Sequence, residues 1–172
     1  MRYLASFVVT LAWALWLGGM VALIVFVQVL FSGDRQIAPN AAPMLFVAFG
    51  RVQLLLGAIA LLGTFAWWVL ARRRAVMMLF TLFAISAALA AASSTLVTAP
   101  MERLREQGRR DSPAFARLHR WSTSLYMGEL LLLLAAGAIL SRGSGEISAA
   151  PQADAQPASA PPPDTGPGTA AA

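Results

Sequence analysis

Polar side chains recur along the last apolar segment of the chain at the spacing of one helix face. They are His119, Ser122, Tyr126 and Glu129. At an advance of about 100° per residue, all four fall within a sector of about 80°. Such a stripe would suit a proton or ion relay, or contacts to a ligand, running into a helix bundle. It would also suit a buried hydrogen-bond network that fixes helix packing, and this second interpretation is favoured because one carboxylate without a second membrane acid makes a thin pathway.

Glu129 is the most informative member of this stripe because apolar residues surround it. Leu130 to Leu134 follow it directly, and a membrane span that began only after Glu129 would have too few apolar residues to cross. The carboxyl group is therefore expected roughly 12 Å below the membrane surface, because Glu129 lies eight residues after Trp121 and a helix rises about 1.5 Å per residue. An acidic residue at a helix centre costs about 2.5 to 3.5 kcal/mol on translocon scales, so we expect Glu129 to face the other helices.

The residues that usually carry metal or covalent chemistry are scarce. His119 is the only histidine of the sequence and there is no cysteine, whereas a b-type haem commonly takes two histidines and a zinc site about three protein ligands. The seven methionines are scattered, which is typical of ordinary packing. No phosphate-binding glycine loop, serine nucleophile with its base or carboxylate pair occurs. The sequence therefore predicts no metal, no cofactor and no enzymatic activity.

The composition indicates that lipid is the solvent of this chain. Of 172 residues, 58% are hydrophobic and only 12% charged, and the mean hydropathy is +0.66. The net charge of +5 comes from 13 basic residues, all arginine. In a membrane protein such arginines first indicate anchoring of loops to lipid headgroups, so lipids and not nucleic acid are the expected partners. The apolar run 3–31 is too long for a signal peptide and is predicted to be a retained helix.

Four segments are long and apolar enough to cross a bilayer about 30 Å thick, which needs roughly 20 residues. The predicted helices span residues 3–31, 52–71, 75–99 and 113–140. The last of them begins outside the bilayer and enters it near Trp121. The sequence thus predicts an all-α, multi-pass bundle over residues 1–142. Residues 143–172, rich in alanine, proline, glycine and serine, are predicted to be a disordered tail.

Arginine and tryptophan side chains mark the expected membrane interfaces. The predicted anchors are Arg51, Arg72, Arg73, Arg74 and Trp121. Arg51 is expected where the second helix enters the lipid, because a long side chain there can reach the headgroups. The arginine triplet is a very short connection, which predicts an antiparallel hairpin of the second and third helices.

The other two connections are predicted to contain interfacial helices. In the first, Asn40 can cap a helix that reaches Phe49 and lies at the interface. In the second, residues 102–106 form a short surface helix that ends near Gly108. Ser112 then precedes a proline, a strong start signal for the last helix.

Small residues indicate where helices pack closely and charges bear on orientation. Gly18 and Gly19 in the first helix would allow close backbone approach between packed helices. Eight arginines fall on the side opposite the N-terminus and five on its own side, which favours an external N-terminus. The compact triplet 72–74 argues the other way, so the orientation stays open.

The chain resembles the transmembrane protein 205-like family, whose bacterial members are small four-helix membrane proteins with a domain of unknown function. The resemblance covers about residues 3 to 140. It is carried by Leu17-Gly18-Gly19-Met20, the stretch 31–49, Thr98-Ala99-Pro100-Met101 and Phe115 to Ser122. The Phe-x-x-Leu-His-x-x-Ser pattern in the last of these looks most specific.

This resemblance implies a four-helix architecture and draws attention to His119 and Ser122. It implies no established substrate, cofactor or reaction. In similar proteins an asparagine commonly follows the histidine by seven positions, and here Tyr126 occupies that place. If the asparagine belongs to a shared site, its chemistry is altered here, although tyrosine keeps a hydrogen-bonding tip.

Two functions from different classes fit these observations, and the sequence alone favours the first. The first is a non-enzymatic structural, assembly or stress-related component of the bacterial inner membrane, acting as a homo-oligomer or with another membrane protein. The second is a small transporter or permease whose proton- or metal-linked stripe runs from His119 to Glu129. Replacing Glu129 by glutamine distinguishes them, because a transporter would lose flux while a structural protein would lose folding yield.

Overall fold

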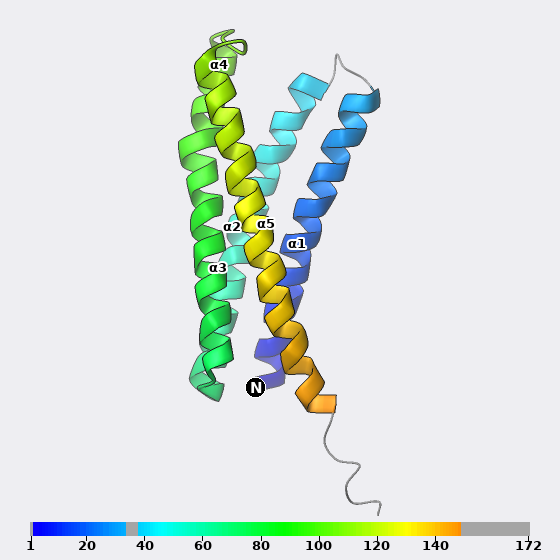
Figure 1. Cartoon of the computed structure of the whole chain (residues 1–172), viewed down its shortest axis with the longest axis vertical. Coiled ribbons are helices and arrows are strands. Elements are labelled where there is room, and N and C mark those ends of the chain that lie inside the picture. The colour runs from blue at the N-terminus through cyan, green and yellow to red at the C-terminus, as the bar shows by residue number, and fades with distance from the viewer. Residues whose placement is uncertain (1, 34–37, 149–172) are drawn as a thin grey trace, which may run out of the picture.

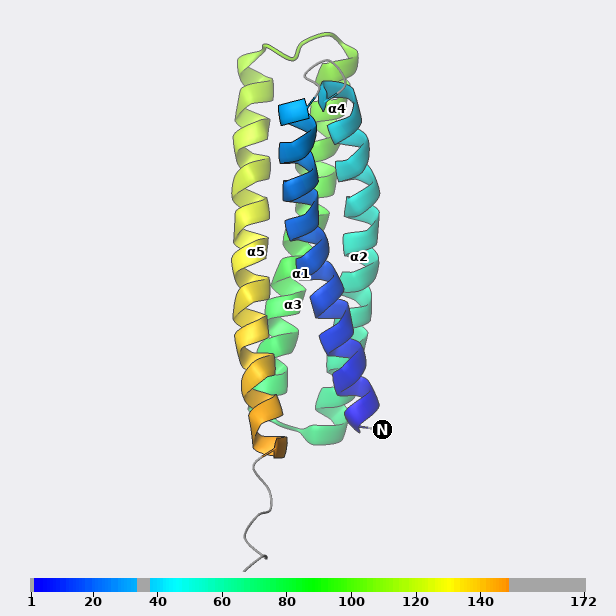
Figure 2. The same cartoon turned by 90° about the vertical axis from the view of Figure 1, so that its right-hand side faces the viewer.

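The computed structural model describes residues 2–33 and 38–148 and is helical along almost all of them. The elements are α1 (Arg2–Gly33), α2 (Ala38–Ala71), α3 (Arg74–Ala92), the π-helix η1 (Ser93–Thr98), α4 (Ala99–Glu106) and α5 (Pro113–Ser148). Because α3, η1 and α4 follow one another without a break, they form a single rod. The chain is therefore a bundle of four long helical rods (Figures 1 and 2).

The rods run up and down, so that each end of the bundle collects particular connections. The N-terminus, the turn at Arg72 and Arg73 and the end of α5 lie at one end, which we call the turn end (Figure 1). The connection 107–112 and the start of α2 lie at the other, which we call the loop end. Toward the loop end, α1 and α2 lean away from α4 and α5 in this view.

Each rod contains a stretch long and apolar enough to cross a membrane. These stretches are Tyr3–Gly33, Ala41–Ala71, Arg74–Glu106 and Pro113–Arg142. Large apolar side chains are exposed on all four rods, as on a surface that faces lipid. The predicted fold class, a four-helix all-α membrane bundle, is confirmed.

Two helix boundaries differ from the prediction. α2 begins at Ala38 instead of residue 52, so the expected interfacial helix is the first part of α2 and Arg51 lies well inside a helix. Continuing the helix satisfies backbone groups that a break within lipid would leave unpaired. α5 continues past the predicted end at residue 140 to Ser148, since adding residues to an existing helix costs little. The rest of the predicted disordered tail, 149–172, lies outside the described residues.

The third rod contains a proline that the helix accommodates by widening. Pro100 lacks an N–H, and its ring would clash with the carbonyl of Leu96 in a regular α-helix. The six residues just before Ala99 form the π-helix η1, whose wider turn gives that ring space. The predicted surface helix at 102–106 is therefore the end of this rod. Gly108, with φ of 67°, then reverses the chain toward α5.

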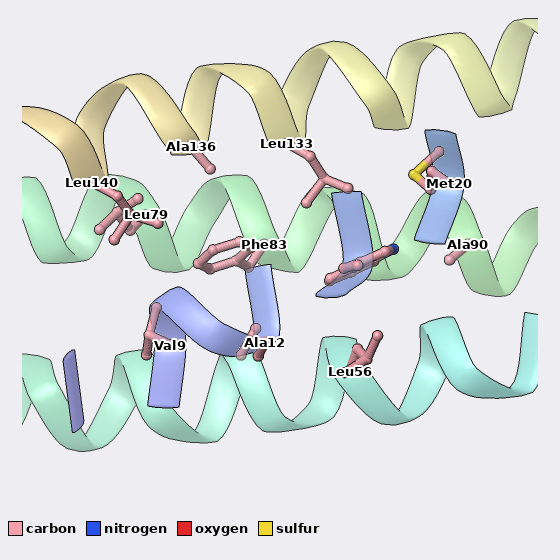
Figure 3. Close-up of a cluster of buried hydrophobic side chains, with 12 residues drawn as sticks. Val9, Ala12, Met20, Leu56, Leu79, Phe83, Ala90, Leu133, Ala136 and Leu140 are labelled. Carbon is pink, nitrogen blue, oxygen red and sulfur yellow. The ribbon is translucent and has the colours of Figure 1, made fainter. Parts of the chain in front are cut away.

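The turn-end half of the bundle is densely packed. Val9, Phe83 and Leu133 are fully buried there and belong to one apolar cluster (Figure 3). Trp16 also belongs to it and stacks on Phe83, with ring centroids 6.5 Å apart. A Cβ atom on Gly137 would lie 2.3 Å from the Trp13 ring, so glycine allows α1 and α5 to meet closely.

The two glycines predicted to pack helix against helix behave differently. A Cβ atom on Gly19 would lie 2.5 Å from the Phe49 ring, so Gly19 does admit α2. Gly18 faces outward, with no atom within 4 Å of its position for a Cβ. The expectation that Gly18 packs within the chain is wrong, because adjacent helix residues lie about 100° apart and point to different neighbours.

Candidate functional site

A cavity of about 570 Å³ occupies the loop-end half of the bundle. All four rods contribute to its wall, for example through Phe31 of α1, Phe49 of α2, Ser94 of η1 and Leu130 of α5. Along α5 it extends from Phe115 to Leu130, which is about 22 Å at 1.5 Å per residue. It therefore reaches from the loop end to roughly the middle of the bundle.

All four residues of the predicted stripe line this cavity. His119 is exposed near the loop end, and Ser122 and Tyr126 are partly buried further in. Glu129 is the deepest of the four and only 2% exposed. The helical spacing read from the sequence thus corresponds to one wall of a real cavity, along which burial increases toward the carboxyl group.

Glu129 accepts two hydrogen bonds from other helices. The indole Nε1 of Trp16 on α1 donates to its Oε1 at 2.8 Å, and the amide Nε2 of Gln53 on α2 donates to the same oxygen at 2.5 Å. Both donors are themselves buried, so a polar cluster of three side chains lies within the apolar core. It joins α1, α2 and α5 where the dense half of the bundle meets the cavity.

This geometry assigns different roles to the two carboxyl oxygens of Glu129. An indole N–H and an amide NH₂ can only donate, so Oε1 acts purely as an acceptor. Any proton that Glu129 carries must therefore be on Oε2, which neither donor engages. Both donors are neutral groups, so neither compensates the charge of an ionised carboxylate.

Tyr126 forms part of the cavity wall and also ties two helices together. Its hydroxyl donates to the backbone carbonyl of Met20 on α1 at 3.2 Å. Its ring meets that of Phe46 on α2 edge to face, with centroids 6.4 Å apart. The Tyr126 hydroxyl is therefore engaged by a backbone carbonyl, while its aromatic ring forms part of the apolar wall of the cavity.

Charged side chains gather where the cavity approaches the loop end. Glu102, Arg105 and Arg110 all line it. Arg105 Nη1 donates to Glu102 Oε1 at 2.8 Å, so these two charges compensate each other. The Nε of Arg105 is buried and has no hydrogen-bond partner among the described residues. The cavity is therefore charged at its loop end and carries a single carboxyl group at its depth.

The π-helix η1, which packs against α5, also lines the cavity. Ser93, Ser94 and Thr98 contribute to this wall. The Ser94 hydroxyl donates to the carbonyl of Ala90 at 3.0 Å, and Gly50 of α2 comes close to it. Short π-helical segments occur often at functional sites, where they redirect side chains. Here the segment adds hydroxyl groups to the wall of the cavity.

The predicted interface anchors occupy three different places. Arg72 and Arg73 form the turn between α2 and α3, Arg74 begins α3, and the Arg72 guanidinium lies 5.8 Å from the centre of the Trp68 ring. Trp121 is 63% exposed on α5. Arg51 instead lines a second cavity, of about 410 Å³, together with Glu102 and Glu106 of α4.

Trp16 and Gln53 are site residues that the sequence interpretation did not identify. Gln53 had a readable signal, since it is an amide within the apolar run 52–71. Trp16 had none, because tryptophans in membrane helices usually indicate interfaces. Which helix faces meet Glu129 depends on the packing of three helices and not on local sequence.

Comparison of the chain with models of protein families, with curated proteins and with solved structures finds no match. The resemblance to the transmembrane protein 205-like family therefore stays a prediction. Among residues 2–33 and 38–148, no group of three or more metal-ligating His, Cys, Asp or Glu side chains occurs. Fold and cavity define the class as a multi-pass helical membrane protein with an internal cavity.

Proposed function

We propose that the protein is a non-enzymatic membrane protein that binds a small amphipathic molecule in the loop-end cavity, as a small permease would. The observation that carries this proposal is the cavity itself, with the polar stripe on one wall and Glu129 at its depth. Its volume falls in the range of roughly 300–1,000 Å³ typical of small-molecule sites. Most of its wall surface is apolar, with polar side chains along the stripe, on η1 and at the loop end, which also suits such a ligand.

The asymmetry of the bundle supports the permease form of this proposal. The cavity approaches the loop end, whereas the turn-end half is packed by side chains such as Phe83 and Leu133. A site near the middle of the membrane that is closed on one side is what one state of an alternating-access protein requires. The bacterial inner membrane is the location that we propose for it.

The test fills the cavity and compares the small molecules that copurify with the protein. Ser122→Trp places a large ring on the cavity wall, whereas Ser124→Trp adds the same ring to the exposed face of the same helix. Solvent extraction and mass spectrometry should show that Ser122→Trp loses a bound molecule which the wild type and Ser124→Trp keep. Equal content in all three proteins would contradict the proposal.

A structural, assembly or stress-related role is the second candidate, and the Glu129 cluster favours it. Hydrogen bonds from Trp16 and Gln53 join three helices through one oxygen, as a packing device would. Such a protein would act as a homo-oligomer or beside another membrane protein. It would tolerate Ser122→Trp without loss of any bound molecule, so the same experiment separates the two candidates.

A further inference from the structure

We propose that the ligand of this cavity is a lipophilic cation and that Glu129 is its counter-ion. This inference rests on the proposed function, since it names the class of molecule that the cavity takes. It starts from the carboxyl group, whose Oε1 is occupied by the N–H groups of Trp16 and Gln53. Oε2 is the oxygen left for a ligand.

Charge balance favours a cationic ligand. The donors to Oε1 are neutral, and in the described part of the chain the arginines that line the cavity, Arg105 and Arg110, lie toward its loop end. Arg105 is moreover paired with Glu102. An ionised carboxylate in such an apolar place is stabilised by a neighbouring positive charge, and a bound cation would supply that charge.

The wall of the cavity fits the rest of such a molecule. Phe46 and Tyr126 meet edge to face there, and Phe49, three residues after Phe46 on α2, also lines the cavity. Aromatic faces attract cations within about 6 Å of the ring, and more strongly where water is excluded. Apolar groups on the cation would meet side chains such as Ile24 and Leu130. The site thus combines one acid with aromatic and aliphatic surface.

An anionic amphiphile is the competing ligand and would bind in the opposite sense. Its head would lie at the loop end beside Arg105 and Arg110, and only its apolar part would approach Glu129. The affinity for an anion would then either not depend on the charge of Glu129 or be lowered by it. Two probes of nearly the same size and shape but opposite charge, tetraphenylphosphonium and tetraphenylborate, separate these cases.

The experiment measures binding of both probes to the purified full chain in a neutral detergent, by equilibrium dialysis, with Ser122→Trp as the background. The wild type should bind tetraphenylphosphonium at least roughly tenfold more tightly than tetraphenylborate. This comparison needs no change at Glu129. Equal binding of both probes, or preference for the borate, would overturn the cation assignment.

Glu129→Gln then tests the counter-ion directly. Its amide oxygen can keep both hydrogen bonds of Oε1, while an uncharged NH₂ replaces Oε2, so the fold should persist in size-exclusion chromatography. Phosphonium binding should fall at least roughly tenfold, whereas Glu106→Gln, which removes an exposed acid outside this cavity, should leave it unchanged. Undiminished phosphonium binding in a folded Glu129→Gln protein would refute the role of Glu129.

The outcomes distinguish this inference from the proposed function. If Ser122→Trp removes binding of a probe but Glu129→Gln does not weaken the phosphonium, the cavity binds small molecules and the counter-ion assignment fails. If neither probe binds above the Ser122→Trp background, and extraction finds no cavity-dependent molecule, the proposed function fails with it.

Discussion

At the scale of single residues, the position of Glu129 follows from what its neighbours can donate. A buried carboxyl oxygen with two N–H donors is held in one place, and its orientation is fixed by α1 and α2. Oε1 of Glu129 therefore joins the helices through its two hydrogen bonds, whereas Oε2 is the oxygen that can contact a ligand. Substitutions of the donors should change stability, while substitutions of the acid should change binding.

Trp16→Phe should lower the stability of the bundle. The change removes the indole N–H that reaches Oε1, leaving Gln53 as the remaining interhelical donor, and it also removes part of a fully buried ring. Interhelical hydrogen bonds in membranes average about 0.6 kcal/mol and reach about 1.7, and the packing loss adds to this. Thermal unfolding in detergent measures the effect, with Trp121→Phe on the exposed surface as the control. An unchanged midpoint for Trp16→Phe would show that the hydrogen bond does not stabilise the fold.

At the scale of elements, the bundle depends on particular glycines and not on glycines in general. Gly137→Ala should destabilise it, because the new Cβ would lie 2.3 Å from the Trp13 ring. That ring cannot move freely, since its Nε1 donates to the carbonyl of Leu133 at 2.7 Å. Overpacking of this kind costs about 1–3 kcal/mol.

Gly18→Ala is the matched control for this prediction. It adds the same methyl group to a membrane helix, but with no atom within 4 Å of its Cβ. Its midpoint of thermal unfolding should equal or exceed that of the wild type, since alanine favours helix over glycine. A clear loss for Gly18→Ala would indicate that this face is covered by another protein chain, as in an oligomer.

At the scale of the whole molecule, the up-and-down arrangement predicts which residues share a side of the membrane. Single cysteines at Arg73 and Arg109 should react with an impermeant maleimide from opposite sides, and the natural chain has no cysteine to interfere. The surplus of arginines at the loop end favours a cytoplasmic position 109, whereas the compact triplet 72–74 argues for the opposite orientation, so the side from which each cysteine reacts also decides the orientation. Labelling of both positions from one side would contradict the four-span topology.

Much of this architecture could be predicted from the sequence because lipid imposes a simple rule. Apolar length revealed the four spans, and helical spacing placed His119 and Glu129 on one face. The start of α2 was missed because Arg51 suggested an interface, whereas the helix runs on through it. The donors from α1 and α2 were missed because their contacts with Glu129 join residues 113 and 76 positions apart in the chain.

The contrast between a dense half and a hollow half has a mechanical consequence. From Trp16 toward the turn end, closely packed side chains hold the four rods together. From Trp16 toward the loop end, α1, α2 and α5 border the cavity. Regions with few internal contacts deform at low energy. Closure around a bound molecule is therefore expected at the loop end, where the rods can approach one another, while the packed turn-end half stays fixed as the hinge.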